Sequence, residues 1–351
     1  MKKGIGAAML MTIGLRLASM AGALDAASDF IRDISADGRL LTVSIAFELG
    51  AKPTGAEPES KPEEALETSG DDASVGGFAY VASPVIRQAQ PKSDDIAEAP
   101  ADVLPTTISG GLRLYNSTDF APDIVALMNE PFELKLPSEG PQILIIHTHG
   151  SEAYTQDDID KYELSDSFRT QDKNYNVMRV GDELKAELEK LGLNVIHDTE
   201  VYDYPSYTGS YSRSGATVQS YLEQHPGIAV VIDLHRDALG SGDVIYKTMA
   251  NVRDESSAQI MMLVGTGENG LYHPYWQKNL KLALHFQAAV NQSYPTLARP
   301  IALVQERYNQ QLSPGMMILE VGSSGNTLRE ALSAIRLFAK AVGGTLKGLV
   351  E

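Results

Sequence analysis

Six short apolar runs, separated by segments with helical spacing, most constrain what this chain can fold into. Continuous apolar runs of this length are typical of strands that are buried on both faces of a parallel sheet. Strands that alternate with helices predict an α/β domain with a mostly parallel central sheet flanked by helices, joined by right-handed crossovers. The six predicted strands are Ile143–Ile146, Leu193–Ile196, Ile228–Leu234, Ile260–Val264, Ile301–Val304 and Met316–Leu319.

Two of the intervening helices have clear limits in the sequence. The segment from Asn174 to Gly192 carries apolar residues at spacings of three and four, and Gly192 is placed to end a helix there. We expect Asp172 to act as its N-terminal cap. Near the C-terminus, Thr327 and Glu330 have the spacing of a capping box. The apolar residues after that box again recur at helical spacing: Leu328, Leu332, Ile335, Phe338 and Val342.

The first 105 residues differ in composition from the rest. Two lysines and an apolar stretch at residues 1–24 predict a secretory signal or a membrane anchor, and therefore export. Residues 25–50 are a short segment to which we assign no function. Residues 51–105 hold seven of the seventeen prolines, with eleven acidic and four basic residues, which predicts an acidic, Pro-rich linker. We expect one globular domain from residue 106 to residue 351.

The charge and the cysteine count exclude several classes of function. A formal net charge of −17 argues against binding to nucleic-acid phosphates or electrostatic docking on an anionic membrane. The sequence has no cysteine, which excludes disulfides, zinc–thiolate sites and thiol catalysis. Any transition metal must then be held by His, Asp or Glu.

Metal-competent side chains follow three of the predicted strands. They come from the stretches IIHTHGSE, VVIDLHRD and MMILEVG, which place His149, Glu152, His235 and Glu320 at the carboxyl ends of strands. Ligands bind at such ends in open α/β sheets. Zinc catalysis needs about three protein ligands and a carboxylate that handles protons. His149, Glu152 and His235 can supply the ligands, and Glu320 can act as the general base.

Further polar residues in the same stretches have candidate supporting roles. Arg236, next to a candidate ligand, is a candidate catalytic residue that stabilises the developing oxyanion. Asp233 and Asp237 could orient the imidazole of His235. We interpret His147, which extends an apolar strand, as a supporting strand residue rather than a ligand. Asp172 stays open as a rival of Glu152 for the third ligand position.

The aromatic-rich stretch YDYPSYTGSYSRS, from Tyr202 to Ser214, is compatible with two interpretations. It could line a groove for a sugar or a peptide, or it could be a packed loop.

The motifs HTHGSEAY, TQDKNYNVMRVGDEL, YPSYTGSYSRS, VIDLHRDA and ILEVGSSGNTLREA together resemble the stage II sporulation protein P family. The resemblance covers roughly residues 106–351 and keeps the order of the motifs. It implies a membrane-anchored, zinc-dependent peptidoglycan hydrolase that cleaves the amide between N-acetylmuramic acid and L-alanine, with endopeptidase activity on peptide cross-links. It also implies action at the sporulation septum during engulfment, with stage II sporulation proteins D and M as partners.

The stretches HGSE, DLH and LEVG are also similar to the motifs of zinc carboxypeptidase-like aminoacylases. This second resemblance implies His149, Glu152 and His235 as ligands and Glu320 as the base. Related cell-wall amidases take their Glu ligand from the start of the first helix, near which this chain has Asp172. Two further hypotheses remain: a zinc carboxypeptidase or aminoacylase that acts on small substrates, and a catalytically inactive wall-binding scaffold.

Overall fold

The computed structural model describes residues 85–86, 106–109, 111–241, 244–252 and 255–351. The chain divides into two units, Met1–Ala73 and Ser74–Glu351, and every described residue belongs to the second unit. The predicted signal or anchor, the segment 25–50 and most of the predicted linker therefore lie outside the described residues. Val85–Ile86 (β1), inside the predicted linker, pairs with Lys247–Thr248 (β9) in antiparallel fashion. The boundary at residue 106 stays a prediction.

Among the described residues, no helix has the length and apolar character that a bilayer crossing requires.

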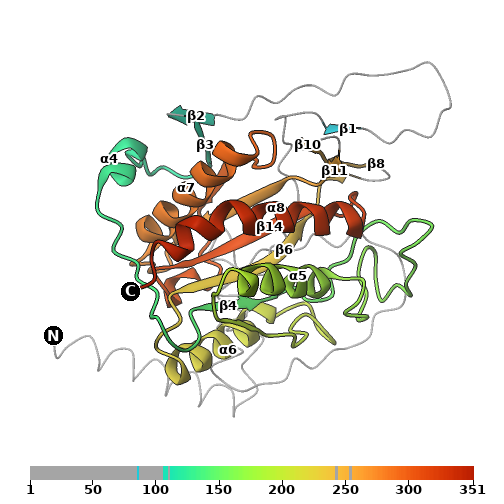
Figure 1. Ribbon diagram of the computed structural model, residues 1–351. Coiled ribbons are helices and arrows are strands. Elements are labelled where there is room, and N and C mark those ends of the chain that lie inside the picture. The colour runs from blue at the N-terminus through green and yellow to red at the C-terminus, as the bar shows by residue number, and fades with distance from the viewer. Residues whose placement is uncertain (1–84, 87–105, 110, 242–243, 253–254) are drawn as a thin grey trace, which may run out of the picture. The chain divides into compact units, whose positions relative to one another are not determined.

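An eight-stranded sheet forms the centre of the second unit (Figure 1). Its neighbouring described strands pair in parallel, except for the antiparallel pairs β2–β3 and β12–β14. The predicted fold class, a mostly parallel sheet flanked by helices, is confirmed. In spatial order the strands are β2 (Thr106–Ser109), β3 (Leu112–Asn116), β13 (Ile301–Val304), β12 (Ile260–Gly265), β14 (Met316–Ser323), β6 (Val230–Asp237), β4 (Ile143–Ile146) and β5 (Val195–His197).

The antiparallel pair β12–β14 divides the sheet into two parallel groups of opposite direction. Strands β14, β6, β4 and β5 have their carboxyl ends at one edge, and β12, β13 and β3 have theirs at the other edge. The three stretches that carry the candidate site include the carboxyl ends of β4, β6 and β14, which all belong to the first group. The topology therefore brings these stretches to one edge of the sheet.

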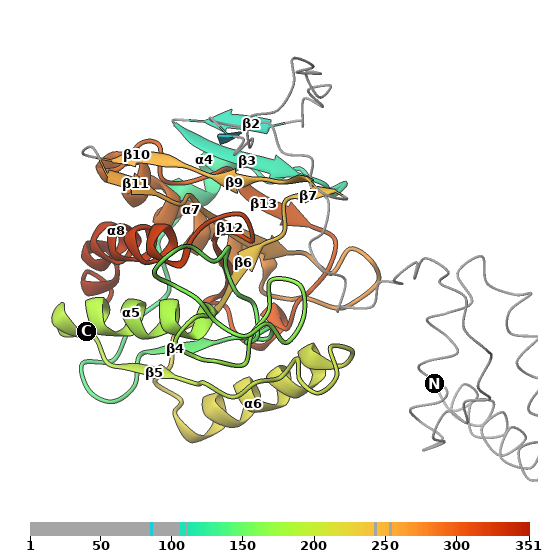
Figure 2. The same cartoon turned by 90° about the vertical axis from the view of Figure 1, so that its right-hand side faces the viewer.

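Helices cover both faces of the sheet (Figures 1 and 2). On one face lie α5, α7 and α8, and on the other lies α6. Strand β4 shows why both faces are covered, because successive side chains along a strand point to opposite faces. Ile143 and Ile145 pack into the core with α5 and α8. Leu144 and Ile146 pack with Val218 of α6. The helices are α4 (Ile124–Asn129), α5 (Val177–Lys190), α6 (Ser210–Gln224), α7 (Trp276–Ser293) and α8 (Leu328–Lys347).

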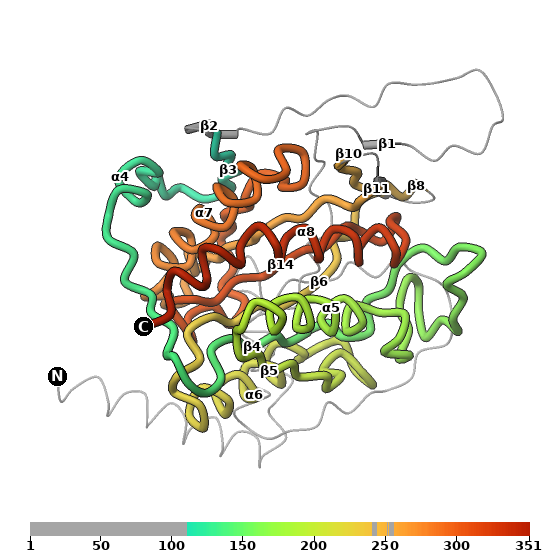
Figure 3. Tube along the Cα trace, in the orientation of Figure 1, coloured from blue at the N-terminus to red at the C-terminus, as the bar shows by residue number. Residues whose placement is uncertain are grey.

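Short elements complete the unit. The C-terminal residues run beside the segment before β4 (Figure 3), where Leu136 and Val350 form an isolated bridge. The remaining elements are β7 (Gly240–Ser241), β8 (Val244–Ile245), β10 (Ala250–Val252), β11 (Glu255–Ser257) and the 3-10 helix η1 (Gln310–Leu312).

The two helices predicted in detail are present. Helix α8 begins after Thr327, which forms the predicted capping box with Glu330 in the first turn. Helix α5 ends before Gly192, which has a φ of 85°. The prediction that Asp172 caps α5 is wrong, because the N-cap is Asn176, whose side chain accepts the N–H of Met178.

Candidate metal centre

The candidate ligands and base lie on one face of the sheet, at the carboxyl ends of β4, β6 and β14. His149 and Glu152 lie in the loop after β4, whereas His235 and Glu320 lie within β6 and β14 as direct neighbours in the ladder. On β6 the side chains of Val230, Ile232 and Leu234 enter the core under α5 and α8. His235 therefore points to the opposite face, on which α6 lies.

His149 is buried between aromatic rings. Its ring stacks on Tyr207 at 4.4 Å between centroids and meets Tyr211 edge-on at 5.5 Å. Burial, together with the nearby His235, lowers the pKa of His149 to about 3. His149 is therefore neutral at physiological pH, which is the state in which an imidazole can coordinate a metal.

Glu152 contacts His235 directly. One carboxylate oxygen, Oε2, lies 3.4 Å from Nδ1 of His235 and also accepts the backbone N–H of Arg236 at 3.1 Å. Burial by itself would raise the pKa of Glu152, but the positive charges of Arg236 and His235 hold it below its usual value. The carboxylate is therefore ionised.

The other ring nitrogen of His235 meets a second carboxylate. Oδ1 of Asp233 lies 2.8 Å from Nε2 of His235, off the direction of the N–H bond, so that the contact is an ion pair. Asp233 also accepts hydrogen bonds from the backbone N–H and the hydroxyl of Thr148, at 2.8 and 2.6 Å. Burial opposes a charge on His235, yet Asp233 and Glu152 hold its pKa well above the usual value. Two carboxylates thus fix the orientation of this ring and keep it protonated in the metal-free site, so a metal that binds it has to displace a proton.

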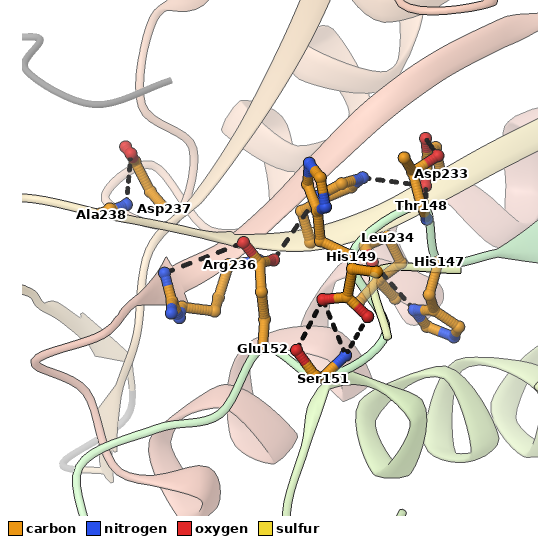
Figure 4. A network of polar contacts seen from close by, with 12 residues as sticks. His147, Thr148, His149, Ser151, Glu152, Asp233, Leu234, Arg236, Asp237 and Ala238 are labelled. Carbon is orange, nitrogen blue, oxygen red and sulfur yellow. Dashed lines mark hydrogen bonds and ion pairs between the residues drawn. The ribbon is translucent and has the colours of Figure 1, made fainter. Parts of the chain in front are cut away.

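Arg236 and Asp237 make contacts that the sequence did not predict. The guanidinium of Arg236 donates from Nε to the carbonyl of Ala153 and from Nη2 to that of Phe168, and its Nη1 lies 3.8 Å from Glu152. Its geometry favours a role in holding Glu152, and the oxyanion role stays a prediction. Asp237 pairs with a buried arginine, Arg299, at 2.7 Å, whereas Asp233 is the carboxylate at the imidazole of His235. Figure 4 shows Arg236 beside Glu152, with Asp237 farther along β6 and Asp233 on the other side.

Glu320 is a buried carboxyl group with one unpartnered oxygen. It is 3 % exposed, and Oε2 makes no hydrogen bond within the described part of the chain. Burial and the nearby negative charge of Asp237 raise the pKa of Glu320 to about 8. A carboxyl group with such a pKa can take up and release a proton near neutral pH.

His147 and Asp172, the remaining candidates, lie apart from this cluster. His147 is fully buried, with Nδ1 2.8 Å from the carbonyl oxygen of Leu234 and Nε2 2.8 Å from His197, so both ring nitrogens are engaged elsewhere. Asp172 is exposed, and its side chain accepts hydrogen bonds from the backbone and the amide of Asn174.

Sequence reasoning missed two charged residues at the cluster. Arg169 lies 3.8 Å from Glu152 and pairs with Asp203 at 2.6 Å. Asp203 in turn accepts hydrogen bonds from the backbone N–H and the hydroxyl of Ser151. Asp203 and Tyr207 both belong to the aromatic-rich stretch from Tyr202 to Ser214 that was noted in the sequence. For Arg169 the sequence carried no signal, because its contacts connect residues distant along the chain.

Two of the three ligand pairs have separations that fit a zinc ion. Tetrahedral zinc with bonds of about 2.1 Å places two donor atoms about 3.4 Å apart, which is the separation of Glu152 Oε2 and His235 Nδ1. The rings of His149 and His235 are 5.3 Å apart at 83°, close to the spacing of about 5 Å for two imidazoles on one tetrahedral ion. Within the described residues, no three His, Asp or Glu side chains are arranged so that they could hold a metal ion together without moving.

A family model described as Stage II sporulation protein P matches residues 55–343 of this chain. The resemblance drawn from the sequence motifs is therefore confirmed. No curated protein matches the chain.

Several solved structures resemble the fold at low sequence identity. The N-acetylmuramoyl-L-alanine amidase AmiC2 of Nostoc punctiforme has a TM-score of 0.34 and 12% identity, covering 60% of this chain and 97% of that one. The CwlD amidase of Clostridioides difficile, in complex with the GerS lipoprotein, has a TM-score of 0.37 and 13% identity, covering 59% and 98%. The amidase Ami1 of Mycobacterium abscessus has a TM-score of 0.36 and 11% identity, covering 59% and 98%. These scores are below 0.5, so the likeness supports no statement about the residues or activity of this chain.

Proposed function

Since this chain belongs to the stage II sporulation protein P family, we propose that it is a zinc-dependent peptidoglycan hydrolase that cleaves the amide between N-acetylmuramic acid and L-alanine. The observation that carries the proposal is the convergence of His149, Glu152, His235 and Glu320 from three strands on one buried site.

In this proposal His149, Glu152 and His235 hold the metal. A zinc ion bound there supplies Lewis acidity for the amide carbonyl and for a water molecule. The chain supplies the orientation of its ligands, since Asp233 lies on the far side of the His235 ring and Arg236 holds Glu152 from its backbone N–H and its guanidinium. Removing either support weakens metal binding without removing a ligand.

Glu320 is the proposed general base and acid. Its unpartnered Oε2 takes the proton from the attacking water and later gives it to the nitrogen of L-alanine as the amide bond breaks. The pKa of about 8 belongs to the metal-free site, and a cation nearby lowers it toward the ionised form that accepts a proton.

The biological setting is proposed from the family and from the sequence. The chain acts outside the cytoplasm, with residues 1–24 as signal or anchor, residues 51–105 as spacer and residues 106–351 as the catalytic domain. The proposed setting is the sporulation septum during engulfment, with stage II sporulation proteins D and M as partners. Cleavage of peptide cross-links is proposed as a second activity on the same substrate.

The test is digestion of purified peptidoglycan by the full chain supplied with zinc, followed by labelling of the new ends. We expect new N-terminal alanine and no new reducing sugar ends. His235→Ala should lose the activity together with zinc, and Glu320→Gln should lose the activity while it retains zinc. His225→Ala, at the C-cap of α6, is the matched control and should keep both. Digestion by His235→Ala at the wild-type rate would contradict the zinc mechanism.

A further inference from the structure

Arg169 is a partly exposed cation at the edge of the ligand cluster. Its side chain is 18% exposed, against 5% for Arg236. Both of its hydrogen bonds start from Nη1, one to Ser151 at 3.0 Å and one to Asp203 at 2.6 Å. Within the described residues no hydrogen bond engages Nε or Nη2. The edge of the guanidinium with two parallel donors is therefore available to a ligand, and this is the edge that pairs with a carboxylate.

Contacts on several sides hold the guanidinium in place. Nη2 lies 3.8 Å from Oε1 of Glu152, and Cζ lies 5.0 Å from the centre of the Tyr207 ring. Tyr207 in turn stacks on His149 at 4.4 Å. Arg169 is thus fixed by two residues next to the reaction site and by Asp203, so a ligand that binds it finds the donors already oriented.

We infer that Arg169 binds a carboxylate of the substrate on the peptide side of the cleaved amide. The inference rests on the proposed amide hydrolysis. In the peptide that follows L-alanine, glutamate is joined through its γ-carboxyl group, and its α-carboxyl group is free in some walls and amidated in others. Arg169 selects the stem peptide that carries the free carboxylate.

The distances allow this contact. Nη2 of Arg169 lies 3.8 Å from Oε1 of Glu152. Since the two carboxylate oxygens are about 2.2 Å apart and a metal–oxygen bond is about 2.1 Å, Nη2 lies within about 8 Å of an ion held by Oε2. Consecutive Cα atoms are about 3.8 Å apart, so the α-carboxylate of glutamate lies up to about 7 Å from the carbon of the cleaved amide. An extended stem peptide can therefore reach Arg169 while its amide lies at the ion.

Arg236 cannot take this role. Its Nε and Nη2 already donate to the carbonyls of Ala153 and Phe168, and its side chain is almost fully buried. A substrate carboxylate at Arg236 would have to displace two backbone hydrogen bonds. Of these two arginines beside Glu152, Arg169 is the more exposed and the one whose Nε and Nη2 make no hydrogen bond within the described residues.

The experiment compares two soluble muramoyl peptides that differ only in the α-carboxyl group of glutamate, free in one and amidated in the other. The full chain is supplied with zinc, and kcat/KM is measured for each peptide. We expect the wild type to favour the free carboxylate by about tenfold to a hundredfold, as a charge-assisted bidentate contact provides. Arg169→Met should reduce that ratio to near one, and Arg169→Lys should leave an intermediate ratio.

Zinc content is measured in every variant. Arg336→Met, which removes an arginine paired with a single carboxylate on α5, is the matched control and should keep the wild-type ratio. Equal kcat/KM of the wild type on both peptides overturns the inference without any variant and leaves the proposed function standing. An unchanged ratio in Arg169→Met with zinc bound also overturns it. Cleavage of neither peptide overturns the proposed function and the inference together.

Discussion

Replacing Asp233 with asparagine tests how the orientation of His235 supports metal binding. Asp233 is fully buried and contacts His235 at 2.8 Å and Thr148 at 2.8 and 2.6 Å. Asparagine keeps the shape but loses the negative charge. Its NH₂ group replaces either Oδ2, which faces the hydroxyl of Thr148, or Oδ1, which faces both the backbone N–H of Thr148 and the ring of His235. The substitution removes the charge of Asp233 and with it the ion pair that orients the ring of His235. Loss of one such contact behind a metal ligand lowers metal affinity about tenfold to a hundredfold.

The measurement is a competition titration of zinc between the protein and a chromogenic chelator, with stability followed by urea unfolding. Asp233→Asn should bind zinc about tenfold to a hundredfold more weakly and should unfold at lower urea. Thr148→Val is the control, because it removes the hydrogen bond from the hydroxyl to Asp233 while it leaves the contact with His235. It should lose stability and keep its zinc affinity. Wild-type zinc affinity in Asp233→Asn would refute the reasoning.

Three further predictions concern stability. Thr327→Ala removes the capping box of α8 and should lower the free energy of unfolding by about 1 kcal/mol in a urea titration; no change would contradict the role of the cap. Gly181→Ala places a Cβ 2.5 Å from Nε2 of His197, and this overpacking should cost about 1–3 kcal/mol, measured as a lower melting temperature. Burial, with nearby Arg307, lowers the pKa of His273 to about 4. The pKa of His273 in the unfolded chain is about 6.5. Its contribution to the free energy of unfolding is therefore fully present above pH 6.5 and is lost as the pH falls toward 4, by about 1.4 kcal/mol per pH unit at most. His273→Asn should flatten this slope, and an unchanged slope would show that another group causes it.

The apolar runs predicted where the strands lie but not where they end. The run before His235 ends at Leu234, whereas β6 continues to Asp237 because it pairs with β14 as far as Ser323. Likewise β14 extends beyond Leu319 and includes Glu320. Backbone pairing continues through polar residues whose side chains have buried partners, and apolar periodicity cannot report that.

The relative direction of neighbouring strands also could not be predicted from the sequence. The run Ile260–Val264 resembles the other apolar runs, yet β12 lies antiparallel to β14. Strand direction depends on the path of the connections through space, which a single apolar run does not encode. The expected convergence still holds because β4, β6 and β14 all belong to the parallel group on one side of that pair.

The polar network around the cluster was predicted only in part. The proposal that Asp233 orients His235 followed from their two-residue spacing, which places both on one side of a strand. The contacts of Arg169 and Asp203 with the loop after β4 connect residues that no local pattern relates. Capping preference alone does not distinguish Asp172 from Asn176, since Asp and Asn are favoured equally at an N-cap, and the structure has Asn176 there.

The central claim is that His149, Glu152 and His235 hold one zinc ion. It is tested most directly by anomalous diffraction at the zinc edge from crystals of the protein grown with zinc. We predict one strong peak about 2.0–2.2 Å from a nitrogen of each histidine and from an oxygen of Glu152, with Glu320 near the open side. A peak coordinated by Asp172 in place of Glu152, or no peak between the two histidines, would contradict the account.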